Sequence, residues 1–332
     1  MDSKVLILLD HRPGNNNQSL ALKLALMQEL KFEHIEIFVK YNLLAKLPNL
    51  FLNPSFITIN KESKNQILSH ITKFKPNIII SAGRRLSIIA LAIKKILKNQ
   101  PKIIQIMNPK KDLSLFDLVI LPNHDKKIDQ YSNVIYINGA LNYINNDEIM
   151  QKNEEYKQRY SSDNKGIISL LIGGKSKNFD IDIETINKVI SKIDKIAKRT
   201  NGKIFILNSR RTSNKINKYI KNNLKDNHSF IDYNSNINNN SPFKAVLALS
   251  NLFIVSPDSI SMISECCGTN KPTYVFNCKK KTSQKHQNFV KYMIENNFLK
   301  EFNINSNYLK EFTPKKFNET KRISLIIKKL FL

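Results

Sequence analysis

The sequence predicts an α/β protein made of two Rossmann-like domains that face each other across a cleft. Short apolar runs alternate with longer amphipathic stretches, as in strand–helix–strand units that build a parallel sheet. This alternation stops in a polar segment rich in Asn, Lys and Glu, Asn142–Asn164, and then starts again. The length of 332 residues also suits two domains better than one. We therefore expect a first domain over 1–150, a second over 151–318, and a C-terminal helix over 319–332 that crosses back to the first.

Six apolar runs in the first half have the length and composition of buried strands. They are Val5–Leu9, Ile35–Val39, Asn77–Ile80, Lys102–Ile106, Leu118–Leu121 and Val134–Ile137. Helical spacing of apolar residues follows some of them, at Gln18–Leu30 and Leu86–Leu97.

The second half repeats this order. Strands are expected at Ile167–Ile172, Lys203–Leu207, Phe230–Tyr233, Leu252–Val255 and Thr273–Phe276. Helices are expected between them at Asp182–Ala197, Lys215–Asn223, Pro242–Leu249 and Ser259–Cys267, and at the end over Glu319–Leu330.

The charge is strongly positive, with 53 Lys and Arg against 27 Asp and Glu and a net charge of +26. One interpretation is a genome rich in A and T, which inflates Lys, Asn and Ile together. A second is weak attraction to an anionic membrane surface, with peripheral association at the inner membrane. A third is nucleic-acid binding, but the cations are spread over the chain without the clustered basic face that such proteins show. We therefore expect no nucleic acid as a partner.

Cysteine use and hydropathy favour the cytoplasm. No apolar run reaches the ~18–20 residues of a membrane span, and the N-terminal run is too short for a signal peptide. Three cysteines, Cys266, Cys267 and Cys278, lack the spacing of metal ligands or of a disulfide framework. Asp180-Ile181-Asp182 has the spacing of a metal-binding Asp-x-Asp motif, but it opens a helix and is interpreted as a cap. We expect no metal and no cofactor.

Two loops of the first domain offer candidate catalytic groups. Asp10 and His11 come directly after the first strand, in a turn that also contains Gly14. His124 follows a later strand of the same sheet. A carboxylate or an imidazole at a strand end can act as a general base. Turn formation, helix capping or a solvated histidine would explain the same residues without a catalytic role.

Two consecutive arginines begin the helix after the third strand. Arg84 and Arg85 lie where the helix dipole is positive, an unfavourable place for cations. A bound anion or acceptor carboxylate would remove that penalty, and Gly14 would open the neighbouring helix N-terminus to the same ligand. Side chains directed to solvent are the alternative.

Three loops of the second domain point to phosphate binding. Gly173 and Gly174 follow the first strand of that half and allow backbone N–H groups to approach a phosphate. Ser209, Arg210 and Arg211 follow the next strand with hydroxyl and guanidinium donors. Neither loop is a Walker A motif, which needs a longer glycine spacing.

The third loop runs from Ser256 into a helix. Asp258 or Ser259 is expected to cap this helix, and Ser261 lies in its first turn, where free N–H groups attract anions. Glu265 lies further along the helix, where a carboxylate can accept hydrogen bonds from ribose hydroxyls. Together the three loops predict a site for the phosphates and the ribose of a nucleotide.

These motifs resemble the mitochondrial-fission Elm family, in the form of a bacterial member, and the resemblance covers nearly the whole chain. It is carried by the following segments: Asp10–Gly14, Asn17–Gln18, Ser81–Arg85, Phe116–Val119, Pro122–Asp125, Asn138–Ala140, Ile172–Gly174, Ser209–Thr212, Asp258–Glu265 and Lys271–Pro272. The family's fold is similar to that of GT-B glycosyltransferases. The resemblance therefore implies a nucleotide-sugar site in the second domain and an acceptor site in the first.

The leading functional hypothesis is a metal-independent glycosyltransferase that acts on a cell-envelope acceptor. Two alternatives share the fold. One is a catalytically inactive GT-B scaffold that recruits partners at a membrane, as the plant members of the family are tied to recruiting a division dynamin. The other is a nucleotide-sugar epimerase, which would use the same donor site.

Overall fold

The chain divides into two compact units. The structure is a computed structural model that describes residues 3–125, 131–144, 166–176, 179–233, 242–306 and 308–331. Unit 1 is Met1–Tyr143 with Asn318–Leu332, and unit 2 is Ile144–Phe317. Most of the expected linker Asn142–Asn164 lies outside the described residues.

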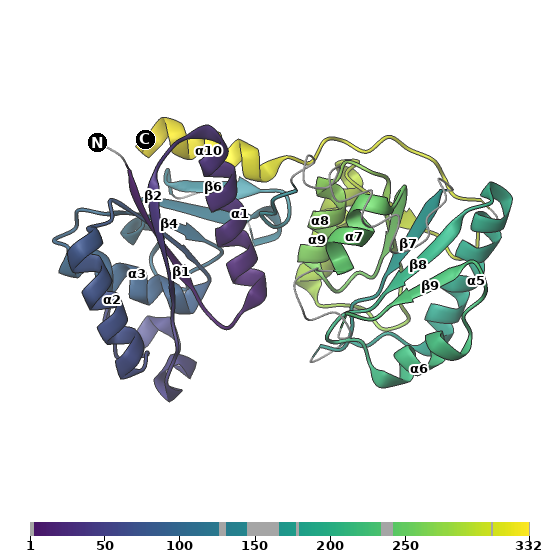
Figure 1. The fold of residues 1–332 in the computed structure, drawn as a ribbon, viewed down its shortest axis with the longest axis horizontal. Coiled ribbons are helices and arrows are strands. Elements are labelled where there is room, and N and C mark those ends of the chain that lie inside the picture. Colours follow the sequence, from purple (N-terminus) through teal and green to yellow (C-terminus); the bar gives the residue numbers. More distant parts are fainter. Residues whose placement is uncertain are drawn as a thin grey trace. The chain divides into compact units, whose positions relative to one another are not determined.

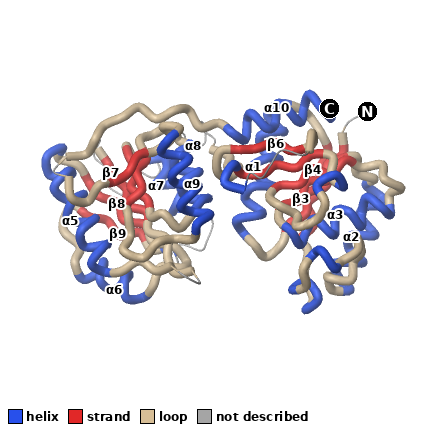
Figure 2. Tube along the Cα trace, turned by 180° about the vertical axis from the view of Figure 1, so that it is seen from behind, coloured by secondary structure: helices blue, strands red, loops and turns tan. Residues whose placement is uncertain are grey.

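Unit 1 is a six-stranded parallel sheet in the order β2-β1-β3-β4-β5-β6, with helices on both faces (Figures 1 and 2). The strands are β1 (Lys4–Leu9), β2 (Glu33–Phe38), β3 (Ile78–Ala82), β4 (Lys102–Ile106), β5 (Leu118–Pro122) and β6 (Val134–Ile137). The helices are α1 (Pro13–Glu29), α2 (Lys61–Phe74), α3 (Arg84–Ile96) and α10 (Glu319–Phe331). Alternate residues of β1 face opposite sides: Val5 packs with α1 and α10, and Leu6 packs with α2 and α3.

The last helix, α10, is part of unit 1. Its first residue, Glu319, accepts hydrogen bonds from the backbone N–H and side chain of Asn138. Its last turn approaches α1, because Lys328 donates to the carbonyl of Glu29. Figure 1 shows α10 and α1 side by side.

Unit 2 is a second six-stranded parallel sheet, in the order β12-β11-β10-β7-β8-β9. The strands are β7 (Ile167–Leu171), β8 (Lys203–Leu207), β9 (His228–Ile231), β10 (Leu252–Val255), β11 (Thr273–Phe276) and β12 (Lys300–Phe302). The helices are α5 (Ile183–Thr200), α6 (Asn214–Asn222), α7 (Pro242–Leu249), α8 (Ile260–Gly268) and α9 (Gln284–Glu295). α5 and α6 cover one face of the sheet, and α7, α8 and α9 cover the other.

Each sheet has one switch point, where successive strands are added on opposite sides. In unit 1 it lies between β1 and β3, because β2 is added on the other side of β1. In unit 2 it lies between β7 and β10, because β8 and β9 are added on the far side of β7. The loops after these strands diverge there and leave a crevice at the carboxyl edge, which is where open α/β sheets bind ligands. The fold therefore singles out the loops after β1, β3, β7 and β10.

The predicted α/β class, with a parallel sheet in each of two Rossmann-like units, and the predicted strands are confirmed, with some corrections. The helix expected at Gln18–Leu30 begins earlier, at Pro13, because proline has the φ angle of a first helical residue. Gly14 is therefore in a helical turn and not in the preceding loop. The strand expected at Phe230–Tyr233 lies two residues earlier, at His228–Ile231. Asp182 is the N-cap of α5, as expected, and accepts a hydrogen bond from the Thr185 N–H at 2.8 Å.

Candidate functional site

Three loops of unit 2 meet around the buried carboxylate of Asp258. The Gly174 N–H donates to Oδ2 of Asp258 at 3.0 Å, and the Ser256 hydroxyl donates to Oδ1 at 2.7 Å. The guanidinium of Arg211 also lies 3.0 Å from Oδ2. Gly174 follows β7, Arg211 follows β8 and Ser256 follows β10, so Asp258 joins the ends of three neighbouring strands. These bonds offset the cost of burying a carboxylate whose side chain is 3% exposed.

The two glycines allow these loops to approach each other. A Cβ on Gly173 would lie 2.2 Å from Oδ1 of Asp258, and a Cβ on Gly174 would lie 2.0 Å from the carbonyl oxygen of Arg211. Their N–H groups were expected to bind a phosphate directly. In the structure the Gly173 N–H donates to Ser256 and the Gly174 N–H to Asp258. The glycines therefore shape the site, and other groups must supply its donors.

The neighbouring arginines have different partners. Arg211 is held by Asp258, whereas Arg210 is exposed and makes no hydrogen bond or ion pair within the part of the chain that the structure describes. Ser209 stabilises the turn, because its hydroxyl accepts from the Arg211 N–H at 3.2 Å. Arg210 is therefore the cation of this loop that is available to a ligand.

The N-terminus of α8 lies at the switch point. Ser259 is its N-cap, and its hydroxyl accepts from the Met262 N–H. The N–H groups of Ile260 and Ser261 have no partner among the described residues, as expected for the first turn of a helix. Glu265 lies further along α8, and its carboxyl group has no hydrogen bond to another described residue. Burial raises the pKa of this group to about 7. Such a carboxyl group changes charge near neutral pH.

His286, in the first turn of α9, was not predicted as a site residue. It interacts with the backbone of Asp258, and its Nδ1 lies 2.7 Å from the Ser283 hydroxyl. Burial lowers the pKa of His286, and the negative charge of Asp258 opposes that shift. The imidazole is therefore favoured in its neutral form. Helix α9, which carries His286, was not among the predicted helices, so no motif pointed to this residue.

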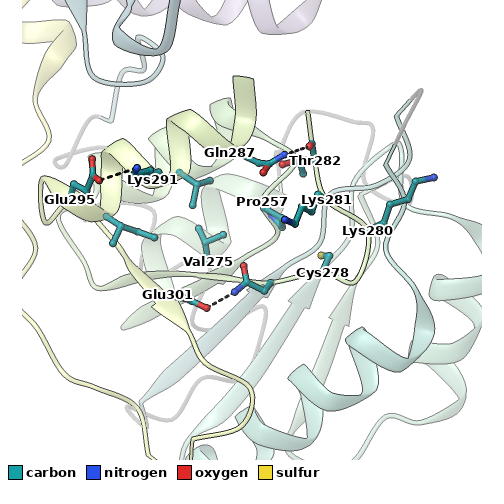
Figure 3. A pocket seen from close by; sticks show the side chains of 13 residues that line it. Pro257, Val275, Cys278, Lys280, Lys281, Thr282, Gln287, Lys291, Glu295 and Glu301 are labelled. Atoms are coloured by element: carbon teal, nitrogen blue, oxygen red, sulfur yellow. Dashed lines mark hydrogen bonds and ion pairs between the residues drawn. The ribbon is translucent and has the colours of Figure 1, made fainter. Parts of the chain in front are cut away.

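A cavity of about 640 Å³ lies next to this site, between α9 and the ends of β11 and β12 (Figure 3). Pro257, which separates Ser256 from Asp258, forms part of its wall. Figure 3 shows Gln287, Lys291 and Glu295 on α9 above the hollow and Val275 and Glu301 below it. Its volume is in the range of small-molecule sites, and its walls mix apolar residues with several lysines.

Unit 1 also has a buried aspartate at its switch point. Asp10 is 1% exposed and accepts hydrogen bonds from the Tyr41 hydroxyl at 3.0 Å and the Arg12 N–H at 2.8 Å. Burial and the charge of Asp10 raise the pKa of Tyr41, which keeps the phenol protonated as a donor. Arg85 lies over the Tyr41 ring, 5.3 Å from its centroid, and 3.4 Å from Nε2 of the exposed His11. Tyr41 is a second residue that the sequence motifs did not indicate.

The first turn of α1 and the start of α3 lie beside this cluster. A Cβ on Gly14 would meet nothing within 4 Å, so this turn is open. Arg84 does not require the anion that its position suggested, because its guanidinium donates to the carbonyl of Leu47 at 2.8 Å and to that of Ala45 at 3.4 Å. These carbonyls already offset the charge of Arg84, and of the two arginines Arg85 is the one beside Asp10 and His11.

His124 lies apart from the other candidate bases. It lies in the short 3₁₀ helix η4 (Asn123–Asp125) after β5, and β3 and β4 separate β5 from β1. Three strand spacings of ~4.8 Å correspond to roughly 14 Å. The structure therefore brings Asp10 and His11 together and leaves His124 elsewhere on the same edge.

Two features are absent from the described residues. No cluster of His, Cys, Asp and Glu there could hold a metal ion. None of the described helices combines the length and the apolar character needed to span a bilayer.

Comparison with solved structures identifies the fold. UDP-GlcNAc 2-epimerase from Methanocaldococcus jannaschii aligns with a TM-score of 0.54 and 14% identity, over 98% of this chain and 99% of that one. Acinetobacter baumannii MurG aligns with a TM-score of 0.51 and 10% identity, over 98% of this chain and 100% of that one. Spinosyn forosaminyltransferase SpnP aligns with a TM-score of 0.51 and 8% identity, over 100% of this chain and 91% of that one. The two Rossmann-like units thus have the fold of GT-B enzymes.

Comparison of sequences identifies the family. The "Uncharacterized protein RP120" of Rickettsia prowazekii (strain Madrid E) is 31% identical over 98% of this chain and 97% of its own length. The "Mitochondrial fission protein ELM1" of Arabidopsis thaliana is 26% identical over 68% of this chain and 57% of its own length. The family model described as Mitochondrial fission ELM1 matches residues 13–331. The chain therefore belongs to the mitochondrial fission ELM1 family.

Proposed function

We propose that the protein binds a nucleotide-sugar at the switch point of unit 2 and transfers the sugar to a cell-envelope acceptor without a metal ion. The observation that carries this proposal is the convergence of three strand-end loops on Asp258, beside an arginine and a helix N-terminus that are both available to an anion. Among solved structures, the M. jannaschii UDP-GlcNAc 2-epimerase in complex with UDP-GlcNAc and UDP shares this fold with a TM-score of 0.50.

In this proposal the donor site stabilises the departing diphosphate. Negative charge develops on the diphosphate as the glycosidic bond breaks, and preorganised positive groups lower the energy of that state. Arg210 and the first N–H groups of α8 supply this charge, with the hydroxyls of Ser259 and Ser261 as further donors. Asp258, Gly173, Gly174 and Arg211 hold the loops in place, and Ser209 supports the turn that carries Arg210.

The proposal also gives roles to the carboxyl groups of Glu265 and Asp10 and to the imidazole of His11. Glu265 accepts hydrogen bonds from ribose hydroxyls when it is ionised. Because its pKa is raised to about 7, this interaction depends on pH near neutrality. At the switch point of unit 1, His11 is the exposed base that takes the proton of an acceptor hydroxyl. Asp10 is a positioning residue there, because Tyr41 and the Arg12 N–H already occupy its carboxylate.

A nucleotide-sugar epimerase is the second candidate, favoured by the structural alignment with UDP-GlcNAc 2-epimerase. Incubation with UDP-sugars separates the possibilities. A transferase releases UDP and leaves the sugar on an acceptor, and an epimerase inverts the second carbon of the sugar. A scaffold binds or ignores the nucleotide without turnover.

The test of the donor site is the affinity for UDP measured by calorimetry. Arg210→Ala should weaken UDP binding by about 1.5–3 kcal/mol, the contribution of hydrogen bonds to charged groups. Thermal stability should not change, because the Arg210 guanidinium has no partner among the described residues. Lys195→Ala is the matched control, since it removes one exposed cation from α5. Equal affinity of wild type and Arg210→Ala would refute the role.

A further inference from the structure

A surface loop of unit 1 exposes more apolar side chain than any other described segment of similar length. It runs from Tyr41 to Ile59 between β2 and α2 and contains two 3₁₀ helices, η1 (Leu43–Lys46) and η2 (Asn49–Phe51). Leu43 is 79% exposed, Leu50 75% and Phe51 78%, the highest values among the exposed large hydrophobic residues of the described chain. We name residues 41–59 the apolar loop. Contiguous exposed apolar surface of this kind marks an interaction site.

The backbone of the apolar loop is fixed at both ends and in the middle. Tyr41 and Ile59 form an antiparallel bridge that closes it. The side chain of Asn49, 2% exposed, donates to the carbonyls of Arg84 and Pro109. Arg84 in turn donates to the carbonyl of Leu47. The loop therefore presents Leu43, Leu50 and Phe51 outward on a rigid frame.

Several carbonyl groups of the apolar loop are already hydrogen-bonded within the protein. Arg84 donates to the carbonyls of Ala45 and Leu47, and Lys111 donates to that of Leu50. The side-chain amide of Asn42 donates to the carbonyls of Ile57 and Ile59. A backbone entering the lipid interface loses water, so an unpaired carbonyl would be costly there. The internal partners remove much of that cost. This feature favours a lipid surface over a partner protein, which could supply its own donors.

The charge around the apolar loop is positive. The sequence contains no acidic residue between Glu36 and Glu62, and Lys46 is exposed. Lys40 is also exposed, but its Nζ lies 3.2 Å from Oε2 of Glu62, so this ion pair offsets its charge. Lys110 and Lys111 approach from the loop after β4, where Lys111 Nζ lies 3.5 Å from the Leu50 carbonyl. Cations beside exposed apolar side chains complement an anionic bilayer surface, where apolar insertion and attraction to lipid phosphates act together.

We propose that the apolar loop docks unit 1 on an anionic lipid bilayer, with Leu43, Leu50 and Phe51 in the interfacial layer and the neighbouring lysines at lipid phosphates. The loop extends from the carboxyl end of β2 and is bonded to the start of α3, so it lies on the same edge of the sheet as Asp10 and His11. Only the idea that docking serves a lipid-linked acceptor rests on the proposed function. The docking surface itself is independent of it.

The experiment is co-sedimentation of the full-length protein with vesicles of phosphatidylcholine alone or mixed with phosphatidylserine. The variant Leu50→Ser/Phe51→Ser should bind mixed vesicles at least tenfold more weakly than wild type, because it removes the most exposed apolar area. The matched control is Leu325→Ser/Leu330→Ser, which changes two exposed leucines of α10. It should bind as wild type does.

A charge comparison tests the basic part of the surface. Lys46→Glu/Lys111→Glu should abolish binding to mixed vesicles, whereas Lys195→Glu/Lys218→Glu in unit 2 should reduce it only slightly. Equal losses from both pairs would overturn the proposal and show that the net charge acts diffusely. Unchanged binding by the Leu50→Ser/Phe51→Ser variant, or no binding by wild type, would also overturn it and leave a protein as the occupant. UDP affinity, measured in parallel, reports separately on the proposed function.

Discussion

Each unit has a buried aspartate at its switch point, and different residues stabilise it in the two units. The two aspartates, Asp10 in unit 1 and Asp258 in unit 2, are 1% and 5% exposed. A buried carboxylate is stable only if hydrogen bonds replace its water. Around Asp10 the donors are a phenol and one N–H, and around Asp258 they are an N–H, a hydroxyl and a guanidinium. In both units the aspartate holds loops together.

The two sites differ in how tightly the chain is packed around them. Near Asp258 there is no room for a single methyl group on Gly173 or Gly174, where it would meet the Asp258 carboxylate or backbone atoms. In unit 1, Gly14 has open space around it, and a Cβ on Gly83 would first meet the side chain of Asn15, at 2.6 Å. Tight packing fixes the positions of donors, as recognition of a diphosphate requires. An open helix turn accepts ligands of varied shape. We therefore expect the proposed nucleotide site of unit 2 to be specific and the proposed acceptor site of unit 1 to be more permissive, and the following predictions test that difference.

The largest effect is expected from Gly174→Ala. Its Cβ would lie 2.0 Å from a backbone carbonyl oxygen that cannot move away without shifting the whole turn. Forcing an extra methyl group into such a site should cost about 3 kcal/mol. Thermal unfolding of the variant should occur at a clearly lower temperature than that of wild type, and UDP binding should be lost with the loop geometry. An unchanged unfolding temperature would show that the loops around Asp258 are less closely packed than described.

The second prediction compares the donors of the two aspartates. Tyr41→Phe removes a buried hydrogen bond to Asp10 and should destabilise the protein by about 2 kcal/mol. Arg211→Ala removes an ion pair to Asp258, but the Arg211 side chain is 45% exposed. Its loss should cost only about 0.5–1 kcal/mol, because solvent screens the pair. Denaturant unfolding of both variants measures the two values, and the reverse order would contradict the account of Asp10.

The third prediction concerns pH and the carboxyl group of Glu265. Burial raises its pKa from the ordinary 4.5 to about 7, so the group is mostly protonated at pH 6 and mostly ionised at pH 8. A carboxylate that accepts ribose hydroxyls should therefore bind UDP about tenfold more weakly at pH 6 than at pH 8, since about one tenth is ionised at pH 6. Without ligand, the stability that Glu265 contributes is fully present below pH 4.5 and is lost as the pH rises through about 7.

Glu265→Gln is the control for this titration, because the β-phosphate of UDP also titrates near pH 6. The variant keeps the phosphate titration and loses the part that belongs to the carboxyl group. Identical pH profiles of wild type and variant, measured by calorimetry, would remove Glu265 from the site.

Most of the fold was predictable because buried parallel strands are continuous apolar runs. Among the strands the exception was β12, whose residues Lys300-Glu301-Phe302 contain two charges and lie at the edge of the sheet. Such a strand has no apolar signal. Among the helices, α2 and α9 were not predicted. The start of α1 was misplaced because Asn15, Asn16 and Asn17 have turn-like composition, although Pro13 is well suited to a first helical position.

The site was predictable only where its residues follow one another in a loop. The run from Asp258 to Glu265 has a recognisable order, and it lies at the switch point as the βαβ pattern requires. Tyr41 could not be assigned to Asp10 from sequence spacing, because their contact exists only when β2 pairs with β1 and brings the ends of both strands together. Sequence alone likewise could not tell that Arg211 pairs with Asp258 and that Arg210 stays exposed, because this depends on where Asp258 lies in the fold.

The smallest effect, and the reverse of the first, is expected from Gly14→Ala. Gly14 lies in the first turn of α1, its φ is not in the left-handed region, and no atom lies within 4 Å of the added methyl group. Alanine also loses less backbone entropy than glycine in a helix, so the variant should be more stable by about 0.5–1 kcal/mol. Denaturant unfolding of Gly14→Ala and Gly174→Ala should give changes of opposite sign in the free energy of unfolding for the same type of substitution. A destabilised Gly14→Ala variant would mean that the turn is not open and that unit 1 resembles unit 2 in its packing.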